Sequence, residues 1–539
     1  MPDEYSPPTT PTPPPEPKRR GGVSFIRAFL ASAFGTGLSR VLGAARDIVI
    51  AGFLGAGAAS DAFWIAFTVP NLFRRFVADE GLTGALVPAL SNAEAEDGEP
   101  GSRRLARVTL GALLVMNLVL CIVGVLAAEP LVYALAWSWR DDPAKLALAV
   151  TMTRWMFPFV AMVSFVSYFE GLLNFRGHFF VPKVAPGLVS AGMVAGALLL
   201  GTSLGEPAFA LVVGVLAGGL VHVLVNVPPL VRRWGWLTPS FRLTPRLRGV
   251  LGELGKVVII GIFAQINVIV LRQIATSLPD GSVTQYHNGT RIVDLAQGIV
   301  AVAIGSALLP NLANAVAEKA WPEFRRELSG GLRLAMFLLV PVAVIVGIWA
   351  EPISAILFRH GRYTWDDVQI TAEGVRYFVP FLLALAATNI VKRVYHALDD
   401  RQTLMVVGAF GVALTGVLGF LMVQPLGVPG LALALSVATV VQLLAYLLVL
   451  QRRLGAHVGL GDLPGPLLRI LLASAPLAPL LWWIGQAGEW PEGPLSPTNW
   501  AVLLGGLIAS GVAYLALAWM LRLEEVSRLL SALRRRVRR

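Results

Sequence analysis

Two apolar segments near the N-terminus of this chain contain an unusual number of ionisable and amide side chains. The candidates in segment 24–53 are Ser39, Arg40, Arg46 and Asp47. The candidates in segment 59–91 are Asp61, Asn71, Arg74, Arg75, Asp79 and Glu80. An ionised side chain at the centre of a bilayer costs roughly 2.5–3.5 kcal/mol by insertion scales. We therefore expect these residues to face a cavity or a partner, which makes them the candidates for function.

Arginine is well suited to holding a phosphate group, because its guanidinium is always charged and matches phosphate oxygens in pairs. Arg40 and Asp47 are two helical turns apart and share a face, whereas Arg46 points about 120° away from Arg40. Arg40 and Arg46 are thus expected on either side of a strip that faces a cavity. A later apolar segment adds Arg291, with Asp294 one turn further on. We predict that Arg40, Arg46 and Arg291 converge on a phosphate-bearing head group.

A structural role is the alternative for each of these arginines. Arginine–carboxylate pairs can fix helix packing, and arginines at helix ends extend to the membrane interface. Arg74 and Arg75 lie toward the cytoplasmic end of their segment, where they either snorkel or recruit the head group at the mouth of the cavity. Arg154 and Arg376 lie near the outer ends of their segments, and we expect them to be structural.

No other pattern in the sequence predicts catalysis or metal binding. The six histidines lack paired metal-ligand spacing, and no Gly-rich stretch reads as an ATP-binding phosphate loop. Asp399 and Asp400 could suggest a metal-binding enzyme, but they lie in a loop between Arg393 and Arg401, which favours a solvated charge patch. The sequence therefore predicts a protein that is not an enzyme, with no catalytic residue, no metal and no cofactor.

Composition indicates the elements that position these residues. The chain is 55% hydrophobic and only 14% charged, with a mean hydropathy of +0.68, whereas soluble domains are about 25% charged. A chain that crosses a bilayer must form helices or a closed barrel, and the apolar segments here are too long to be barrel strands. Each run exceeds the ~20 residues that cross the hydrocarbon core. The fourteen predicted spans are 24–53, 59–91, 106–136, 146–175, 182–204, 208–231, 250–278, 283–316, 330–358, 367–398, 402–424, 428–451, 465–487 and 498–522.

The distribution of charge predicts the orientation. If the N-terminus is cytoplasmic, the outer loops contain only four basic residues, which are Arg140, Lys145, Arg359 and Arg362. Most other basic residues then lie on the inside, as positive-inside topology requires, so both termini are predicted to be cytoplasmic. The net charge of +11 is explained in this way and does not indicate nucleic-acid binding. The basic tail 524–539 suits anionic membrane lipids, and Cys121 is expected to be a buried apolar residue.

An internal repeat divides the chain. Residues 85–96 match residues 307–318 at eight of twelve positions, at an offset of 222. The same offset relates Ala128-Glu129-Pro130 to Ala350-Glu351-Pro352. Because six spans separate the copies, the two lobes should have the same orientation and hold a substrate between them. The predicted parts are a Pro-rich cytoplasmic tail (1–22), an N-lobe (23–233), a C-lobe (234–455), two lipid-facing helices (456–523) and a basic cytoplasmic tail (524–539).

Several ordered motifs carry a resemblance to a known family. In the first two spans they are Ser39-Arg40-Val41-Leu42-Gly43, Arg46-Asp47, Gly55-Ala56-Gly57, Asp61-Ala62-Phe63, Pro70-Asn71-Leu72, Arg74-Arg75, Glu80-Gly81 and Val87-Pro88. Further on they are Arg291, Ala307-Leu308-Leu309-Pro310, Leu357-Phe358-Arg359-His360-Gly361 and Tyr395-His396-Ala397-Leu398-Asp399-Asp400. With these motifs the sequence resembles the MurJ/MviN lipid II flippases, within the multidrug/oligosaccharidyl-lipid/polysaccharide exporter superfamily.

The resemblance implies a function and a set of site residues. The family has fourteen helices, in two six-helix lobes plus two C-terminal helices, and it moves undecaprenyl-pyrophosphate-linked peptidoglycan precursor across the bacterial inner membrane by alternating access. Its cavity arginines correspond to Arg40, Arg46, Arg74 and Arg291, and Asp61 is an acidic position of interest. The predicted supporting or gating residues are Ser39, Asp47, Asp61, Asn71 and Glu80. The implied partners are lipid II, membrane lipids and the cell-wall synthesis machinery.

One departure from the family concerns the driving force. Some members have acidic residues in the seventh and eleventh helices that are linked to sodium, whereas the matching positions here are Leu271, Thr415 and Gly419. This difference disfavours a sodium site and favours the membrane potential as the driver. One alternative is export of another polyprenyl-linked oligosaccharide, and a second is antiport of a cationic drug, which the excess of arginine disfavours. A third is a membrane enzyme acting on polyprenyl phosphates, for which Asp399 and Asp400 are the only acidic pair and lack a partner at ligand spacing. A fourth is a scaffold role in which the arginines are dispensable.

Overall fold

All regular structure in the described part of the chain is helical. The computed structural model describes residues 22–74, 81–178, 180–201, 203–304 and 308–526. Within these ranges, nine helices are long and apolar enough to cross a membrane. Each of the fourteen predicted spans falls on one helix or on consecutive helices. The prediction of an all-helical, multi-pass membrane protein is confirmed.

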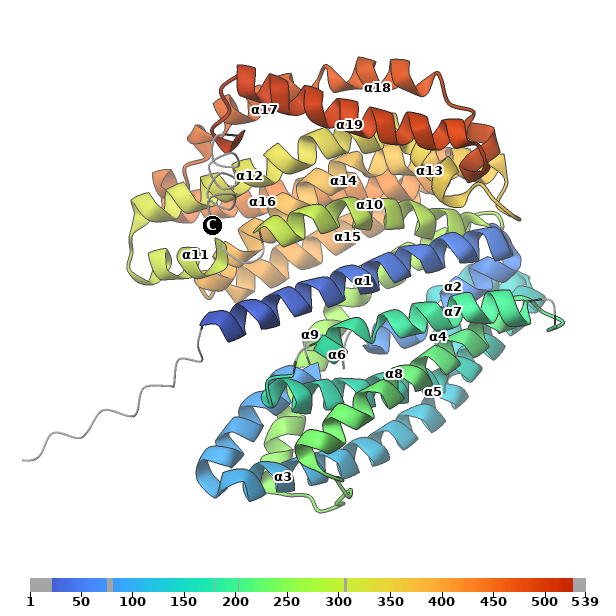
Figure 1. Cartoon of the computed structure of the whole chain (residues 1–539), viewed down its shortest axis with the longest axis vertical. Coiled ribbons are helices and arrows are strands. Elements are labelled where there is room, and N and C mark those ends of the chain that lie inside the picture. The colour runs from blue at the N-terminus through green and yellow to red at the C-terminus, as the bar shows by residue number, and fades with distance from the viewer. Residues whose placement is uncertain (1–21, 75–80, 179, 202, 305–307, 527–539) are drawn as a thin grey trace, which may run out of the picture.

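The helices form two halves and a C-terminal group (Figure 1). Those of the first half are α1 (Gly22–Leu54), α2 (Ala58–Arg74), α3 (Gly81–Leu126), α4 (Ala128–Leu135), α5 (Pro143–Phe175), α6 (Phe180–Val184), α7 (Gly187–Leu200) and α8 (Ala208–Trp234). Those of the second half are α9 (Pro245–Ala275), α10 (Ser282–Ile304), α11 (Leu308–Ala317), α12 (Trp321–Ile348), α13 (Ala350–Phe358), α14 (Trp365–Ala397), α15 (Arg401–Leu426) and α16 (Val428–Leu454). The C-terminal group is α17 (Pro464–Ser474), α18 (Leu477–Gly485) and α19 (Pro497–Met520).

The sequence repeat is visible in how equivalent helices begin. Asp142 caps α5 by accepting a hydrogen bond from the amide of Lys145. Thr364 caps α14 in the same way, through the amide of Asp367, and forms a complete capping box. Asp142 and Thr364 are 222 positions apart, which is the offset of the sequence repeat. Helices α5 and α14 are therefore equivalent in the two copies and begin with the same kind of cap.

Glycine sets two features of the first half. Gly98 has φ 69° and ψ −167° within α3, so the chain turns there between two spans. Helices α7 and α8 pack backbone to backbone, because a Cβ on Gly192 would lie 2.4 Å from the carbonyl oxygen of Gly214. Small residues allow this close approach of helices where lipid surrounds the protein.

The two halves form separate lobes that meet at one end (Figure 1). We call this the outer end, since it contains the loops 55–57, 276–281 and 359–364 that the charge distribution places outside. The lobe of α1–α8 and the lobe of α10–α16 diverge toward the end at which α1 begins. Helix α9 packs against α3 and α4 as well as α15 and α16, so it connects the lobes although the predicted boundary assigned it wholly to the second.

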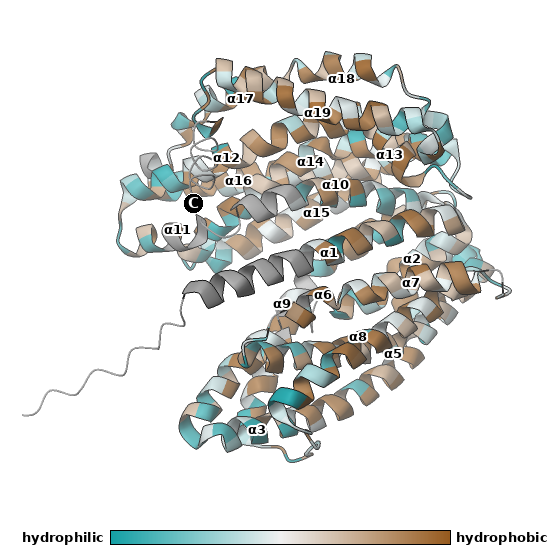
Figure 2. Cartoon of the chain, viewed as in Figure 1, coloured by the Kyte–Doolittle hydropathy of each residue, from teal (hydrophilic) through white to brown (hydrophobic). Residues whose placement is uncertain are grey.

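The C-terminal group covers one side of the second lobe. Helices α17 and α18 pack on α12, and α19 packs on α13. Tyr514 donates a hydrogen bond to the carbonyl of Phe337 at 2.6 Å, and Trp349 donates one to Leu481 at 2.8 Å. Large hydrophobic side chains are exposed along these helices, and Figure 2 shows by colour how many residues of α17–α19 are hydrophobic. Such a surface suits contact with lipid chains.

Candidate functional site

A cavity of about 470 Å³ lies between α1 of the first lobe and four helices of the second. Its polar lining residues are Arg40, Arg46, Asp47, Arg291, Asp294, Gln297, Asn389 and Arg393. Four of these are arginines and two are aspartates, so the lining has an excess of positive charge. In a site partly shielded from water, this excess favours an anionic ligand.

Asp47 is the shared anion of two arginines that come from different lobes. Its carboxylate lies 2.7 Å from Arg46 Nη2 and 3.0 Å from Arg291 Nε. Arg46 and Asp47 are buried, whereas about a third of the Arg291 side chain is exposed. Arg291 also contacts Asp294 at 3.4 Å, one turn along α10. The ion pair between Asp47 and Arg291 therefore joins α1 to α10 across the lobe boundary.

His287 extends this cluster and was not predicted from the sequence. Its Nε2 lies 3.8 Å from Asp47, and its ring stacks on Trp64 of α2 with the centroids 3.6 Å apart. Arg272 of α9 contacts the other ring nitrogen at 3.4 Å. His287 precedes Arg291 by four residues, so helical spacing alone could have placed both on one face.

The structure brings four of the predicted residues together at the cavity. Arg40, Arg46, Asp47 and Arg291 all line the cavity. Arg74 instead donates a hydrogen bond to Asn71 at 2.9 Å within α2, and none of the cavity-lining residues belongs to α2. The Cα of Ser39 would lie 3.4 Å from a Cβ on Gly187, so this part of α1 packs on α7.

Three of the polar positions named in the second apolar segment cannot be placed. Arg75, Asp79 and Glu80 lie outside the described residues. Arg376, which was expected to be structural, pairs with Glu351 at 3.8 Å near the outer end of its helix.

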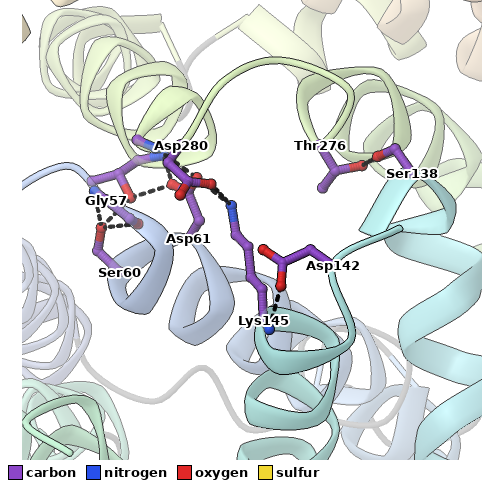
Figure 3. A network of polar contacts seen from close by, with 10 residues as sticks. Gly57, Ser60, Asp61, Ser138, Asp142, Lys145, Thr276 and Asp280 are labelled. Carbon is purple, nitrogen blue, oxygen red and sulfur yellow. Dashed lines mark hydrogen bonds and ion pairs between the residues drawn. The ribbon is translucent and has the colours of Figure 1, made fainter. Parts of the chain in front are cut away.

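Asp61 lies at the outer end of the molecule, where it connects the lobes (Figure 3). Its buried carboxylate accepts hydrogen bonds from the amides of Gly281 and Thr284, at 2.8 and 3.0 Å, and from the Thr284 hydroxyl at 2.8 Å. The acceptor belongs to α2 and the donors lie at the start of α10. Asp61 therefore stabilises the N-terminal end of a helix in the other lobe.

Lys145 completes this outer network, and the sequence placed it only among the outer-loop charges. Its ammonium lies 3.3 Å from Asp61 and 2.6 Å from Asp280, and it sits 4.3 Å from the ring centroid of Trp139. Asp280 belongs to the loop before α10, so the lysine bridges the lobes as well. Nothing local in the sequence indicated this pairing, because Lys145 and Asp61 are far apart along the chain.

A second outer contact joins α1 to the loop after α13. The amide of Arg362 donates a hydrogen bond to the carbonyl of Gly52 at 2.8 Å. A Cβ on Gly361 would lie 2.2 Å from the same carbonyl, so this loop requires glycine at that position. With the Asp61 network, this contact closes the outer end of the cavity region.

The positions that matched sodium ligands in the family have other contacts here. Thr415 donates a hydrogen bond to the carbonyl of Gly411 at 2.8 Å, and Gly419 faces Ile274. In the described part of the chain, no group of three or more His, Cys, Asp or Glu side chains is arranged to hold a metal ion. Asp399 pairs with Arg401, and Asp400 pairs with Arg453.

The fold and the cavity define a class of protein: a two-lobed, all-helical membrane transporter with an arginine-rich cavity between its lobes. Residues 50–484 match the family described as lipid II flippase MurJ. The chain belongs to this family, which consists of transporters and not of enzymes.

Individual relatives agree with this assignment, and two solved structures share the fold. The lipid II flippase MurJ of Burkholderia cenocepacia is 29% identical over 510 residues, which cover 93% of this chain and 98% of the relative. The probable lipid II flippase MurJ of Rhizobium meliloti is 30% identical over 511 residues, covering 92% and 94%. A structure of a lipid II flippase MurJ in an inward closed conformation has a TM-score of 0.74 at 18% identity, covering 92% of this chain and 98% of that one. An inward-facing multidrug resistance MATE transporter of the MOP superfamily has a TM-score of 0.64 at 15% identity, covering 78% and 96%.

Proposed function

We propose that this protein is a lipid II flippase that moves the undecaprenyl-pyrophosphate-linked peptidoglycan precursor from the inner to the outer leaflet of the bacterial inner membrane. The observation that carries the proposal is the cavity between the lobes, where arginines outnumber carboxylates. Membership of the flippase family supplies the identity of the cargo.

The arginines would hold the pyrophosphate while the lipid tail stays in the membrane. Guanidinium groups match phosphate oxygens bidentately, and Arg40, Arg46 and Arg291 come from both lobes. The lipid tail would lie against the exposed apolar face of the C-terminal helices. Large side chains exposed there include Leu468, Leu471, Leu472, Trp482 and Trp483.

Transport would proceed by alternating access. The outer end is closed by the bonds that Asp61 and Lys145 make to the start of α10 and the loop before it. For the cargo to pass outward, these bonds must break and the inner ends of the lobes must approach. The cargo can drive this change only by binding one state more tightly than the other. We propose the membrane potential as the remaining driver, because Leu271, Thr415 and Gly419 offer no carboxylate for sodium.

The charge of the cavity bears on the alternatives. A cationic drug would meet an excess of arginines, which disfavours antiport of such compounds. Another polyprenyl-linked oligosaccharide has the same anionic group, so charge does not separate it from lipid II. Export of such an oligosaccharide is therefore the alternative that the experiment must address.

The test is translocation of lipid II in cells depleted of their own flippase. The protein is expected to restore exposure of the precursor on the outer leaflet. Arg40→Gln, Arg46→Gln and Arg291→Gln, compared at matched expression, should each reduce that exposure at least tenfold, because each removes a charge-assisted contact of roughly 1.5–3 kcal/mol. Arg401→Gln, which alters an exposed arginine at the start of α15, is the control.

Each outcome of this test has a distinct meaning. Absence of rescue by well-expressed wild-type protein would indicate a different cargo, such as another polyprenyl-linked oligosaccharide. Rescue by all three cavity variants would show that these arginines support helix packing and do not bind the cargo.

A further inference from the structure

Two arginines of the cavity, Arg40 and Arg393, have no role in the ion pairs described above. Arg393 lies near the end of α14 and lines the cavity together with Asn389 and Ile390. Its Nη1 is buried and has no hydrogen-bond partner among the described residues. A guanidinium donor left unpaired at membrane depth is costly unless a ligand completes it.

A second unpaired donor faces the same cavity. The side-chain nitrogen of Gln297, on α10, is also buried without a partner in the described ranges. Both groups are donors, so a ligand with several acceptor oxygens would satisfy them together. Phosphate groups supply such oxygens and also carry the opposite charge to the arginine.

The arginines of the cavity lie at two depths along α1 and α10, which we call the outer level and the inner level. At the outer level, Arg291 pairs with Asp47. At the inner level, Arg40 lies against α10 next to Gly298, since a Cβ on that glycine would be 2.5 Å from Arg40 Nη1. The two levels are seven residues apart along both helices, which corresponds to about 10 Å.

The levels differ in how far their charge is neutralised. Asp47 compensates Arg46 and Arg291 at the outer level. At the inner level, neither Arg40 nor Arg393 forms an ion pair with any described carboxylate. The inner arginines therefore attract an incoming anion more strongly than the outer pair does.

We propose that Arg393, with Arg40 and Gln297, forms an inner anion subsite that binds the phosphate oxygens of the lipid-linked cargo before these reach Arg46 and Arg291. The proposal rests on the proposed function and extends it to one residue of α14. Arg40 belongs to the first lobe and Arg393 to the second, so an anion held by both draws the inner ends of the lobes together. The subsite thus couples binding to closure of the cytoplasmic side.

The experiment measures binding to the full-length protein in lipid nanodiscs, with undecaprenyl pyrophosphate and lipid II as separate probes. Arg393→Gln should weaken the binding of undecaprenyl pyrophosphate about tenfold, which corresponds to one charge-assisted contact. Lys392→Gln is the matched control, because the Lys392 ammonium lies 5.9 Å from the Tyr446 ring of α16 and the residue does not line the cavity. The control should change binding by less than twofold.

A conservative variant separates charge from folding. Arg393→Lys retains the cation but loses the planar guanidinium, so it should bind with intermediate affinity. A merely structural role for Arg393 would lower the unfolding midpoint while leaving the affinity of the folded protein unchanged.

The two probes separate this proposal from the proposed function. Equal binding of undecaprenyl pyrophosphate by wild type, Arg393→Gln and Lys392→Gln would overturn the inner subsite, as would absence of binding by wild type. Loss of that binding in Arg393→Gln alone would support the subsite even if wild type failed to bind lipid II, and that failure would overturn only the cargo proposed above.

Discussion

Asp47 is the residue on which the electrostatics of the cavity depend. One carboxylate lies against Arg46 of its own helix and Arg291 of the other lobe, and it is almost fully buried. Without it, two arginines would face each other in a region of low dielectric constant. The aspartate therefore permits both arginines to remain in the cavity, where an incoming phosphate can compete for them.

Asp47→Asn is expected to lower the stability of the protein strongly. Removal of one partner from a buried ion pair leaves an uncompensated charge and costs about 3 kcal/mol or more. The unfolding midpoint of the purified protein measures this loss. Asp294→Asn is the control, since the Asp294 side chain is 59% exposed and its pair with Arg291 contributes less than about 1 kcal/mol. Equal midpoints for the Asp47→Asn variant and the wild type would contradict this account.

At the scale of the helices, the start of α10 is held by a side chain of the other lobe. Asp61 of α2 accepts the free amides at that helix end, and Lys145 of α5 neutralises the carboxylate. Three helices thus meet at one buried carboxylate. Because all its polar atoms have partners, the network specifies one arrangement of these helices in the closed state.

Lys145→Met should destabilise the protein, because Asp61 would keep its charge in a buried position without a cation. In a double-mutant cycle with Asp61→Asn, the two losses should be less than additive, with a coupling energy of about 2 kcal/mol. Unfolding of each purified variant gives the four values. Additive losses would show that the lysine and the aspartate do not interact. Arg140→Met, which changes a half-exposed outer-loop residue, should cost less than about 1 kcal/mol.

At the scale of the whole molecule, the two lobes are joined at the outer end and diverge toward the inner end (Figure 1). The contacts at the outer end include the polar bonds of Asp61 and Lys145, which can break and re-form when the interface opens and closes. The hydroxyls of Ser60 and Thr284 lie 2.9 Å apart across this interface.

A disulfide at that interface should stop transport. Ser60→Cys with Thr284→Cys, in a Cys121→Ser background, places two thiols where the hydroxyls now meet, within reach of disulfide geometry. Oxidation is expected to hold the outer end closed and abolish exposure of the precursor on the outer leaflet, and reduction should restore it. Each single-cysteine variant should transport under both conditions. A cross-linked protein that transports at the wild-type rate would exclude opening at this interface.

The sequence by itself determined the class of fold and the part of the site that lies on α1. The length of the apolar segments and the charge of the loops predicted a multi-pass helical protein. A segment in lipid must hydrogen-bond its own backbone groups, and loops rich in Lys and Arg remain on the cytoplasmic side. Helical spacing placed Arg40 and Asp47 on one face of α1, and both line the cavity. Arg74 does not line this cavity and bonds to Asn71 within its own helix, so its role in receiving the cargo stays a prediction.

Only the tertiary structure decided which helix packs against each of the polar helix faces. The pairs of Asp47 with Arg291, Lys145 with Asp61 and Arg40 with Gly298 join segments that are far apart in the sequence. Helical periodicity fixes the direction of a side chain relative to its own axis, but it says nothing of the neighbour on that side. The neighbour is set by packing of the two lobes, and that packing is the reason why Lys145, His287 and Arg393 emerged only from the structure.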